Sequence, residues 1–286
     1  MRVLHFLIPP DEAGKTVEAV LRRRGISSRL MTDLKKYPEG LQKNGAHIRT
    51  CDTVAAGDTL TLVIRELAAP DIPPSSVPVP VLYESEDAVV FNKPPHMPVH
   101  RSKNHQLDTL ENVFAARYPG LVFRAVNRLD RDTSGCVVVA KNPFAAKALT
   151  GGVTKCYLAV VEGRLTPVCG TAELPVWRPD PHRTERTVDS RGQYARTDWQ
   201  VLKAGKRHSF VRCTLFTGRT HQIRVHMAHL GHPLAGDDMY GGSREQIGRQ
   251  ALHCAVVEFC DPADASAVRL CAPMPEDMQK MIKYYL

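Results

Sequence analysis

Two carboxylates and two arginines fall within five residues of the segment 127–135, which reads Asn-Arg-Leu-Asp-Arg-Asp-Thr-Ser-Gly. The apolar run Cys136 to Ala140 follows directly and predicts a buried strand. Charged groups at the end of a buried element are costly unless they are paired. We therefore expect a carboxylate of this segment to have a cationic partner and a functional role.

Part of this segment, Asp132 to Gly135, is similar to the Asp-Thr-Gly loop of aspartic proteases. Those enzymes use two carboxylates that share one proton, so a second loop is expected. The spacing here differs by one residue, and the sequence has no second copy. We do not favour proteolysis.

A second polar segment, 218–233, carries histidines at positions 226, 229 and 232 and permits a zinc site as an alternative. The pattern H-E-x-x-H is absent, and Gly231 and Pro233 turn the chain before the third histidine can align. We therefore expect histidines that are hydrogen-bonded in a packed helix or contact phosphate, and no metal.

The chain of 286 residues divides at a proline-rich stretch. We predict a small α/β RNA-binding domain over 1–66, a linker over 67–79 and a catalytic domain over 80–286. In the last, strands are expected at 79–83, 88–92, 136–141, 155–161, 195–202, 209–216 and 252–259. Helices are expected at about 107–118, 143–151 and 220–230, and after Pro275. Consecutive strands without intervening helices predict an α+β fold with a mixed, largely antiparallel sheet.

The N-terminal domain is strongly basic. Helical spacing predicts a helix from Val17 that stops at Gly25, and a second helix capped by Ser28. Asn44-Gly45 predicts a hairpin turn before a strand at 59–64. Between residues 22 and 49 there are eight Lys or Arg and two Asp or Glu. A solvated helical face is the alternative, but this charge density favours contact with RNA or DNA.

Net charge, cysteine pattern and the absence of nucleotide-binding motifs restrict the classes of function that the sequence supports. The net charge of +8 favours a polyanionic partner. Neither G-x-G-x-x-G nor G-x-x-x-x-G-K-[ST] occurs, so dinucleotide and P-loop chemistry are not supported. Eight cysteines without a C-x-x-C pair favour a reduced cytoplasmic protein. The short apolar N-terminus and the lack of a long apolar run predict neither a signal peptide nor a membrane span.

Three segments together resemble the RluA-type pseudouridine synthases. They are the segment 127–135, the strand 155–161, and Thr-Gly-Arg-Thr-His-Gln-Ile-Arg-Val-His at 217–226 with its continuation to Tyr240-Gly241. The stretches 81–84 and 90–95 resemble the start of that catalytic domain. The resemblance covers about residues 80–286. More loosely, residues 14–65 resemble an RNA-binding module of a small-subunit ribosomal protein.

The resemblance implies an enzyme that detaches uracil from ribose, rotates it and rejoins it through carbon five, without a cofactor. Asp130 matches the catalytic aspartate, which needs a cation beside it. Arg219 matches the arginine that pairs with it, and arginine suits this role because it binds carboxylates in a bidentate manner. Tyr157 matches the tyrosine that lies against the target base.

The target uridine must be flipped out of a folded RNA. Arg128 matches the residue that occupies the vacated position. Asn127 stands where the family often has histidine, and we expect Asp132 to cap backbone amides in a turn. The substrate-binding residues that we predict are Arg128, Asn127, His221, Arg224, Arg22, Arg23, Arg29, Lys35 and Lys36.

Other expectations concern partners and substrate. The segment 236–241 is expected to shape the pocket wall, and the basic segment 178–196 to form a mobile loop that clamps RNA. Ribosomal RNA is favoured over transfer RNA, and a monomer is the default. A non-catalytic RNA-binding or ribosome-assembly protein on the same fold is the alternative.

Overall fold

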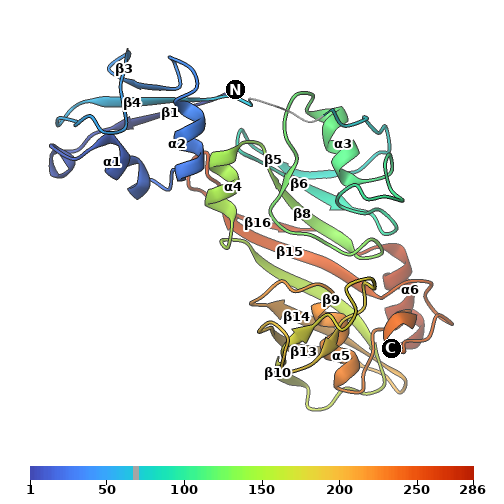
Figure 1. Cartoon of the computed structure of the whole chain (residues 1–286). Helices are drawn as coiled ribbons and strands as arrows, with labels where there is room; N and C mark the ends of the chain where they lie inside the picture. Colours follow the sequence, from blue (N-terminus) through green and yellow to red (C-terminus); the bar gives the residue numbers. More distant parts are fainter. Residues whose placement is uncertain (67–70) are drawn as a thin grey trace.

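The computed structural model describes residues 1–66 and 71–286, so the first four residues of the predicted linker lie outside the described residues. The N-terminal unit is a four-stranded sheet with two helices packed on it (Figure 1). Its elements are β1 (Arg2–Leu7), α1 (Val17–Arg23), α2 (Ser28–Leu34), β2 (Leu41–Lys43), β3 (Ala46–His47) and β4 (Thr59–Ile64), in the sheet order β1-β4-β2-β3.

Local signals explain these elements. The Thr16 hydroxyl accepts a hydrogen bond from the Ala19 amide at the start of α1. The cap of α2 is Ser27 rather than the predicted Ser28, because the Ser27 hydroxyl accepts from the Leu30 amide. Asn44 and Gly45 both have positive φ, as a tight hairpin between β2 and β3 requires.

The remainder of the chain forms one long twisted sheet. Its strands are β5 (Val81–Glu84), β6 (Ala88–Lys93), β7 (Arg124–Ala125), β8 (Ser134–Ala140), β9 (Thr154–Glu162), β10 (Cys169–Glu173), β13 (Arg196–Ala204), β14 (His208–Leu215), β15 (Leu252–Cys260) and β16 (Ala267–Cys271). The order is β10-β13-β14-β9-β15-β8-β6-β5, with β16 on β15 and β7 on β8. Among these strands only β8 and β15 pair in parallel, so the predicted α+β fold with a mixed, largely antiparallel sheet is confirmed.

Helices and short elements flank this sheet. They are α3 (Leu110–Arg117), α4 (Pro143–Leu149), α5 (Gln222–His229), α6 (Glu276–Tyr285), the 3-10 helix η2 (Asp238–Tyr240), and the paired strands β11 (Val176–Trp177) and β12 (Thr187–Val188). A further 3-10 helix, η1 (Pro10–Glu12), belongs to the N-terminal unit. Helix α3 starts later than predicted because Thr109 and Asn112 form a capping box there. Strands β1, β7, β10, β11, β12 and β16 were not predicted. None of the described helices is long and apolar enough to span a membrane.

Polar contacts join the N-terminal unit to the large sheet. Arg2 on β1 donates two hydrogen bonds to the buried carboxylate of Asp87, at 2.9 and 3.2 Å. The Asn142 amide binds the same carboxylate at 2.6 Å. Arg124 and Glu66 form a second ion pair, and Phe144 of α4 packs against the N-terminal core. Hydrogen bonds and ion pairs therefore connect the two units, and the carboxylate of Asp87 that takes part in them is buried.

Gly135 places the segment 127–135 against the central strand. It has φ +113°, and a Cβ at this position would lie 2.2 Å from the carbonyl oxygen of Cys254 on β15. Only glycine tolerates both the backbone conformation and this approach. The carboxylates that precede β8 are thereby held at the end of the central strands.

Candidate active site

Asp130 lies in the turn that precedes β8. The Thr133 amide donates to the Asp130 carbonyl at 3.1 Å and closes this turn. The Asp130 side chain faces a hollow and keeps 24% of its surface exposed. Residues that line the hollow with it include Arg128, Tyr157, Arg219, His221 and Arg224.

Arg224 on α5 is the cation beside Asp130. Its Nη1 donates to Asp130 Oδ2 at 3.0 Å, while Nε and Nη2 bind the two oxygens of Asp237 at 2.7 and 2.8 Å. Burial opposes the charged form of Arg224, but the hydrogen bonds and charges of Asp237 and Asp130 outweigh burial and raise its pKa. The ring of Tyr240 lies 5.0 Å from the guanidinium. One fixed cation is thus shared between two carboxylates.

The predicted pairing of Arg219 with Asp130 is wrong. Among the described residues Arg219 forms no ion pair, and its Nε donates to the Tyr194 carbonyl at 3.1 Å. Arg219 precedes α5 and is exposed at the rim of the hollow, whereas Arg224 lies within the helix and is buried. Arg224, which was predicted to bind RNA, is therefore the arginine that pairs with Asp130.

Tyr157 on β9 contributes the apolar wall of the hollow. Its side chain is almost fully buried, between Cys213 on β14 and Cys254 on β15 in the strand register. Burial raises the pKa of Tyr157 well above its ordinary value, and the charge of Asp130 acts in the same direction. Tyr157 is therefore a neutral phenol beside the carboxylate.

His221 begins α5 in a left-handed conformation, with φ 58°. Its Nδ1 lies 2.8 Å from the Tyr240 hydroxyl, and its Nε2 lies 3.8 Å from Asp130 Oδ2. Burial lowers the pKa of His221 although Asp130 opposes this effect. The Tyr240 hydroxyl oxygen accepts a hydrogen bond from the Arg186 amide. The hydroxyl hydrogen of Tyr240 is then available to donate to Nδ1 of His221. In the tautomer in which Tyr240 donates to Nδ1, the ring proton of His221 lies on Nε2, which faces Asp130.

The structure corrects two further predictions in the segment 127–135. Asn127 was expected to bind RNA, but its amide bonds the β8 backbone at Cys136 and Val138. Asp132 was expected to cap amides, but its carboxylate pairs with His96 at 2.8 Å and with Arg131 at 3.1 Å. Arg128 is exposed at the rim of the hollow, as a residue that contacts RNA must be.

Of the three histidines that permitted a zinc site, His226 and His232 have protein partners, and His229 is exposed. His226 lies 2.9 Å from the Thr197 hydroxyl and 2.9 Å from the Leu174 carbonyl. His232 lies 2.8 Å from the Glu162 carbonyl. No group of three or more metal-binding side chains is found within residues 1–66 and 71–286. The packing of His226 is thus that of a hydrogen-bonded helix residue.

Basic side chains cover the helical side of the N-terminal unit. Those predicted to bind RNA are all exposed, namely Arg22, Arg23, Arg29, Lys35 and Lys36. Arg22 pairs with Glu18 and Lys36 pairs with Asp33. Within the described part of the chain no ion pair is found for the other three.

Sequence reasoning missed several residues that build the site. The prediction for Asp237 was only that its segment, 236–241, shapes the pocket wall. In the structure its carboxylate pairs with Arg224, and its side chain is 1% exposed. The available signal was an acidic residue close to the apolar pair Leu234-Ala235, separated from it only by Gly236. The basic segment 178–196 is not a free loop throughout, because β12 pairs with β11 and Arg186 binds Tyr240.

Comparisons with known proteins identify the family. A family model described as RNA pseudouridylate synthase matches residues 87–229. The chain is 41% identical over 278 residues to "Uncharacterized RNA pseudouridine synthase YjbO" of Bacillus subtilis, covering 94% of this chain and 98% of the relative. It is 37% identical to "Ribosomal large subunit pseudouridine synthase D" of Xylella fastidiosa, covering 96% of this chain and 90% of the relative.

A solved structure agrees with these relatives. "Human RNA Pseudouridylate Synthase Domain Containing 1" superposes with a TM-score of 0.58 and 32% identity, covering 70% of this chain and 85% of that one. Sequence relatives, family model and fold thus indicate one activity, and a purely RNA-binding role for the fold is disfavoured. The chain belongs to the RNA pseudouridine synthase family, among its RluA-type members, and is an isomerase that converts uridine in RNA to pseudouridine.

Proposed function

We propose that Asp130 is the nucleophile that this chain uses to isomerise a flipped uridine in structured RNA. The observation that carries this proposal is the position of its carboxylate. It faces the hollow, lies 3.0 Å from the fixed cation Arg224, and shares the hollow with the apolar ring of Tyr157. A carboxylate positioned in this way can react with the ribose or the base.

The reaction is balanced without any added group. The bond between uracil N1 and ribose C1′ breaks, the ring turns, and C5 bonds to C1′. The proton on C5 leaves to solvent and N1 ends protonated. Asp130 activates the nucleoside and is regenerated at the end, so the reaction needs no cofactor.

Tyr157 and His221 act as neutral groups in this proposal. The raised pKa of Tyr157 disfavours the phenolate that a strong base would require, so packing against the uracil ring is its main role. His221 presents a neutral N–H toward Asp130 and is placed to bind a uracil oxygen or the carboxylate.

Surface charge supports an extended RNA contact. Arg128 and Arg219 are exposed at the rim, where Arg128 is placed to fill the space of the flipped base and Arg219 to bind phosphate. Arg23, Arg29 and Lys35 extend the basic surface on the N-terminal unit, which we propose as a second RNA-binding site.

Ribosomal RNA is the substrate that we favour, because the Xylella relative that covers most of the chain is named for the large ribosomal subunit. Transfer RNA is the second candidate. Pseudouridine mapping of total RNA from cells with and without the gene tests both. We expect one or a few positions in large-subunit ribosomal RNA to lose the modification. Loss confined to transfer RNA would contradict the substrate, and no loss anywhere would contradict a cellular role of the activity.

A further inference from the structure

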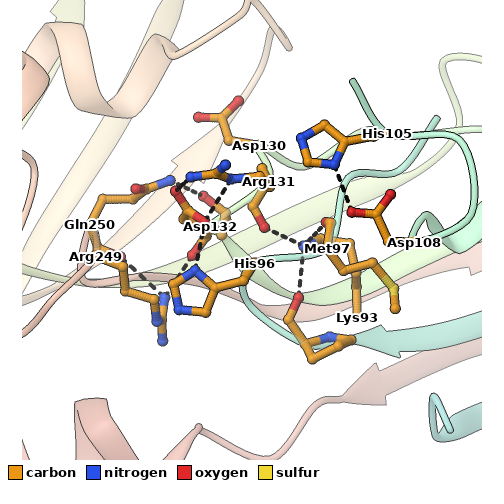
Figure 2. Close-up of polar contacts among 12 residues, drawn as sticks. Lys93, His96, Met97, His105, Asp108, Asp130, Arg131, Asp132, Arg249 and Gln250 are labelled. Carbon is orange, nitrogen blue, oxygen red and sulfur yellow. Dashed lines mark hydrogen bonds and ion pairs between the residues drawn. The ribbon is translucent and has the colours of Figure 1, made fainter. Parts of the chain in front are cut away.

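Successive backbone groups of the turn after Asp130 are held by buried donors from distant parts of the chain. The first donor is Lys93, at the end of β6, whose side chain is fully buried. Its Nζ donates to the carbonyls of Pro94, Met97 and Arg131 at 2.8, 2.7 and 3.0 Å (Figure 2). Three acceptors match the three N–H groups of the protonated side chain, so Lys93 is held in place in its charged form.

The second donor is Arg249, which precedes β15 and is 2% exposed. Its Nη1 donates to the Asp132 carbonyl at 3.0 Å and to the carbonyls of Gln250 and Leu252 at 3.1 and 3.3 Å. Its Nε and Nη2 bind the two carboxylate oxygens of Asp277 at 2.6 and 2.9 Å. Asp277 lies in the first turn of α6, the last helix of the chain.

The neighbouring Gln250 completes the arrangement. Its amide donates to the Thr133 hydroxyl at 3.2 Å. The three residues that follow Asp130 are therefore each anchored, and the amide of the third closes the turn on the Asp130 carbonyl. In Figure 2 the Asp130 carboxylate points away from Lys93 and Arg249.

We infer that Arg249 is a positioning residue for Asp130, and that Asp277 of the C-terminal helix orients Arg249 while Lys93 holds the neighbouring carbonyl. The inference rests on the proposed role of Asp130. A bidentate carboxylate fixes the plane of a guanidinium, which then directs Nη1 at the carbonyls of Asp132, Gln250 and Leu252. Without that carboxylate, Arg249 is a buried cation with only carbonyl partners, and the turn shifts to solvate it.

The test is Asp277→Asn, which keeps the side-chain size and removes the charge that orients Arg249. Glu276→Gln is the matched control, because Glu276 is the preceding residue of α6 and its partner Lys280 is exposed. The assay follows tritium released from C5 of uridine in an unmodified transcript of large-subunit ribosomal RNA. Each rate is divided by the folded fraction, obtained from thermal melts of the full chain.

We expect Asp277→Asn to lower kcat about 10- to 100-fold with KM within about threefold, because a small misplacement of a reacting group costs this much. The Thr133 amide, read by hydrogen exchange, should exchange faster in Asp277→Asn and not in Glu276→Gln. Arg249→Lys is the second variant, since a lysine cannot hold Asp277 in a bidentate manner and also reach the Asp132 carbonyl. It should reproduce the loss of kcat.

A wild-type kcat in folded Asp277→Asn and Arg249→Lys would overturn the inference. Complete unfolding of both variants would also overturn it, because the pair would then serve folding alone. Asp130→Asn separates this from a failure of the proposed function. If that variant is active, the nucleophile is wrong, whereas an inactive Asp130→Asn beside a fully active Asp277→Asn refutes only the positioning role.

Discussion

Arg224 and Asp130 are 94 residues apart in the chain, yet their side chains meet through a 3.0 Å hydrogen bond between Nη1 and Oδ2. The contact joins the start of α5 to the turn before β8, and thereby unites the two polar segments of the sequence in one site. Asp237 holds the other two donor positions of the same guanidinium.

Replacing Asp130 tests the nucleophile. Asp130→Asn keeps the shape but removes the reactive carboxylate, so we expect isomerisation to fall at least about 1000-fold. RNA binding, measured by filter retention, should stay within a few-fold of wild type. Asp108→Asn is the control, because Asp108 is exposed and pairs with His105. Substantial turnover in Asp130→Asn would exclude the proposed mechanism.

Comparing the two arginines tests which one serves Asp130. Arg224→Lys cannot bind Asp237 and Asp130 together, so kcat should fall about 100-fold or more. Arg219→Lys keeps an exposed cation at the rim, and we expect it to retain kcat and to raise KM only a few-fold. The reverse pattern in steady-state kinetics would restore Arg219 as the partner.

Asp237→Asn tests the buried side of the site. Removing one partner leaves part of the charge of Arg224 uncompensated, and we expect the free energy of unfolding to fall by about 3–5 kcal/mol. The next residue is a matched control. Asp238 pairs with Arg244 at the surface, and Asp238→Asn should change stability by less than about 0.5 kcal/mol. Urea denaturation of both variants measures the difference, and equal stability would contradict the shared-cation arrangement.

Lys93 gives a pH dependence of stability. Burial lowers its pKa to about 7, the carboxylates of Asp132 and Asp130 act against this effect, and Arg249 adds to it. Between this value and the unfolded value of 10.5, the unfolded chain binds more protons than the folded chain. Stability from this residue therefore increases as the pH rises, by at most about 1.4 kcal/mol per pH unit.

The variant Lys93→Met removes this titration. The difference in unfolding free energy between wild type and Lys93→Met, measured by urea denaturation at pH 7, 8 and 9, should grow in favour of wild type. A constant difference would mean that the three carbonyls keep the ammonium protonated in the folded state.

The sequence predicted the elements with strong periodicity and clear caps, such as the strand at 136–141 and the helix that opens at Pro143. It missed β1. The short apolar run before Pro9-Pro10 was judged only as a possible signal peptide, and not as a strand. It missed β16 because the strand has only five residues, and so short an apolar run does not distinguish a strand from other structure.

Within the site, sequence reasoning placed Asp130, Tyr157 and the segment 217–226 together but chose the wrong arginine. The reason is the left-handed residue His221, which sets where α5 begins. Arg219 lies before that turn and points to the Tyr194 carbonyl, while Arg224 lies on the buried face of the helix. The choice of Arg219 rested on the family resemblance, and the motif alone does not reveal which of its two arginines lies inside the site.

The sharing of Arg224 has a consequence for charge balance during turnover. With both carboxylates ionised, Asp130, Arg224 and Asp237 carry one net negative charge. When Asp130 bonds to carbon or accepts a proton, the trio becomes neutral, because Asp237 still matches the guanidinium. No unbalanced cation is left facing the detached uracil, and the same charge state is restored when Asp130 is released for the next uridine.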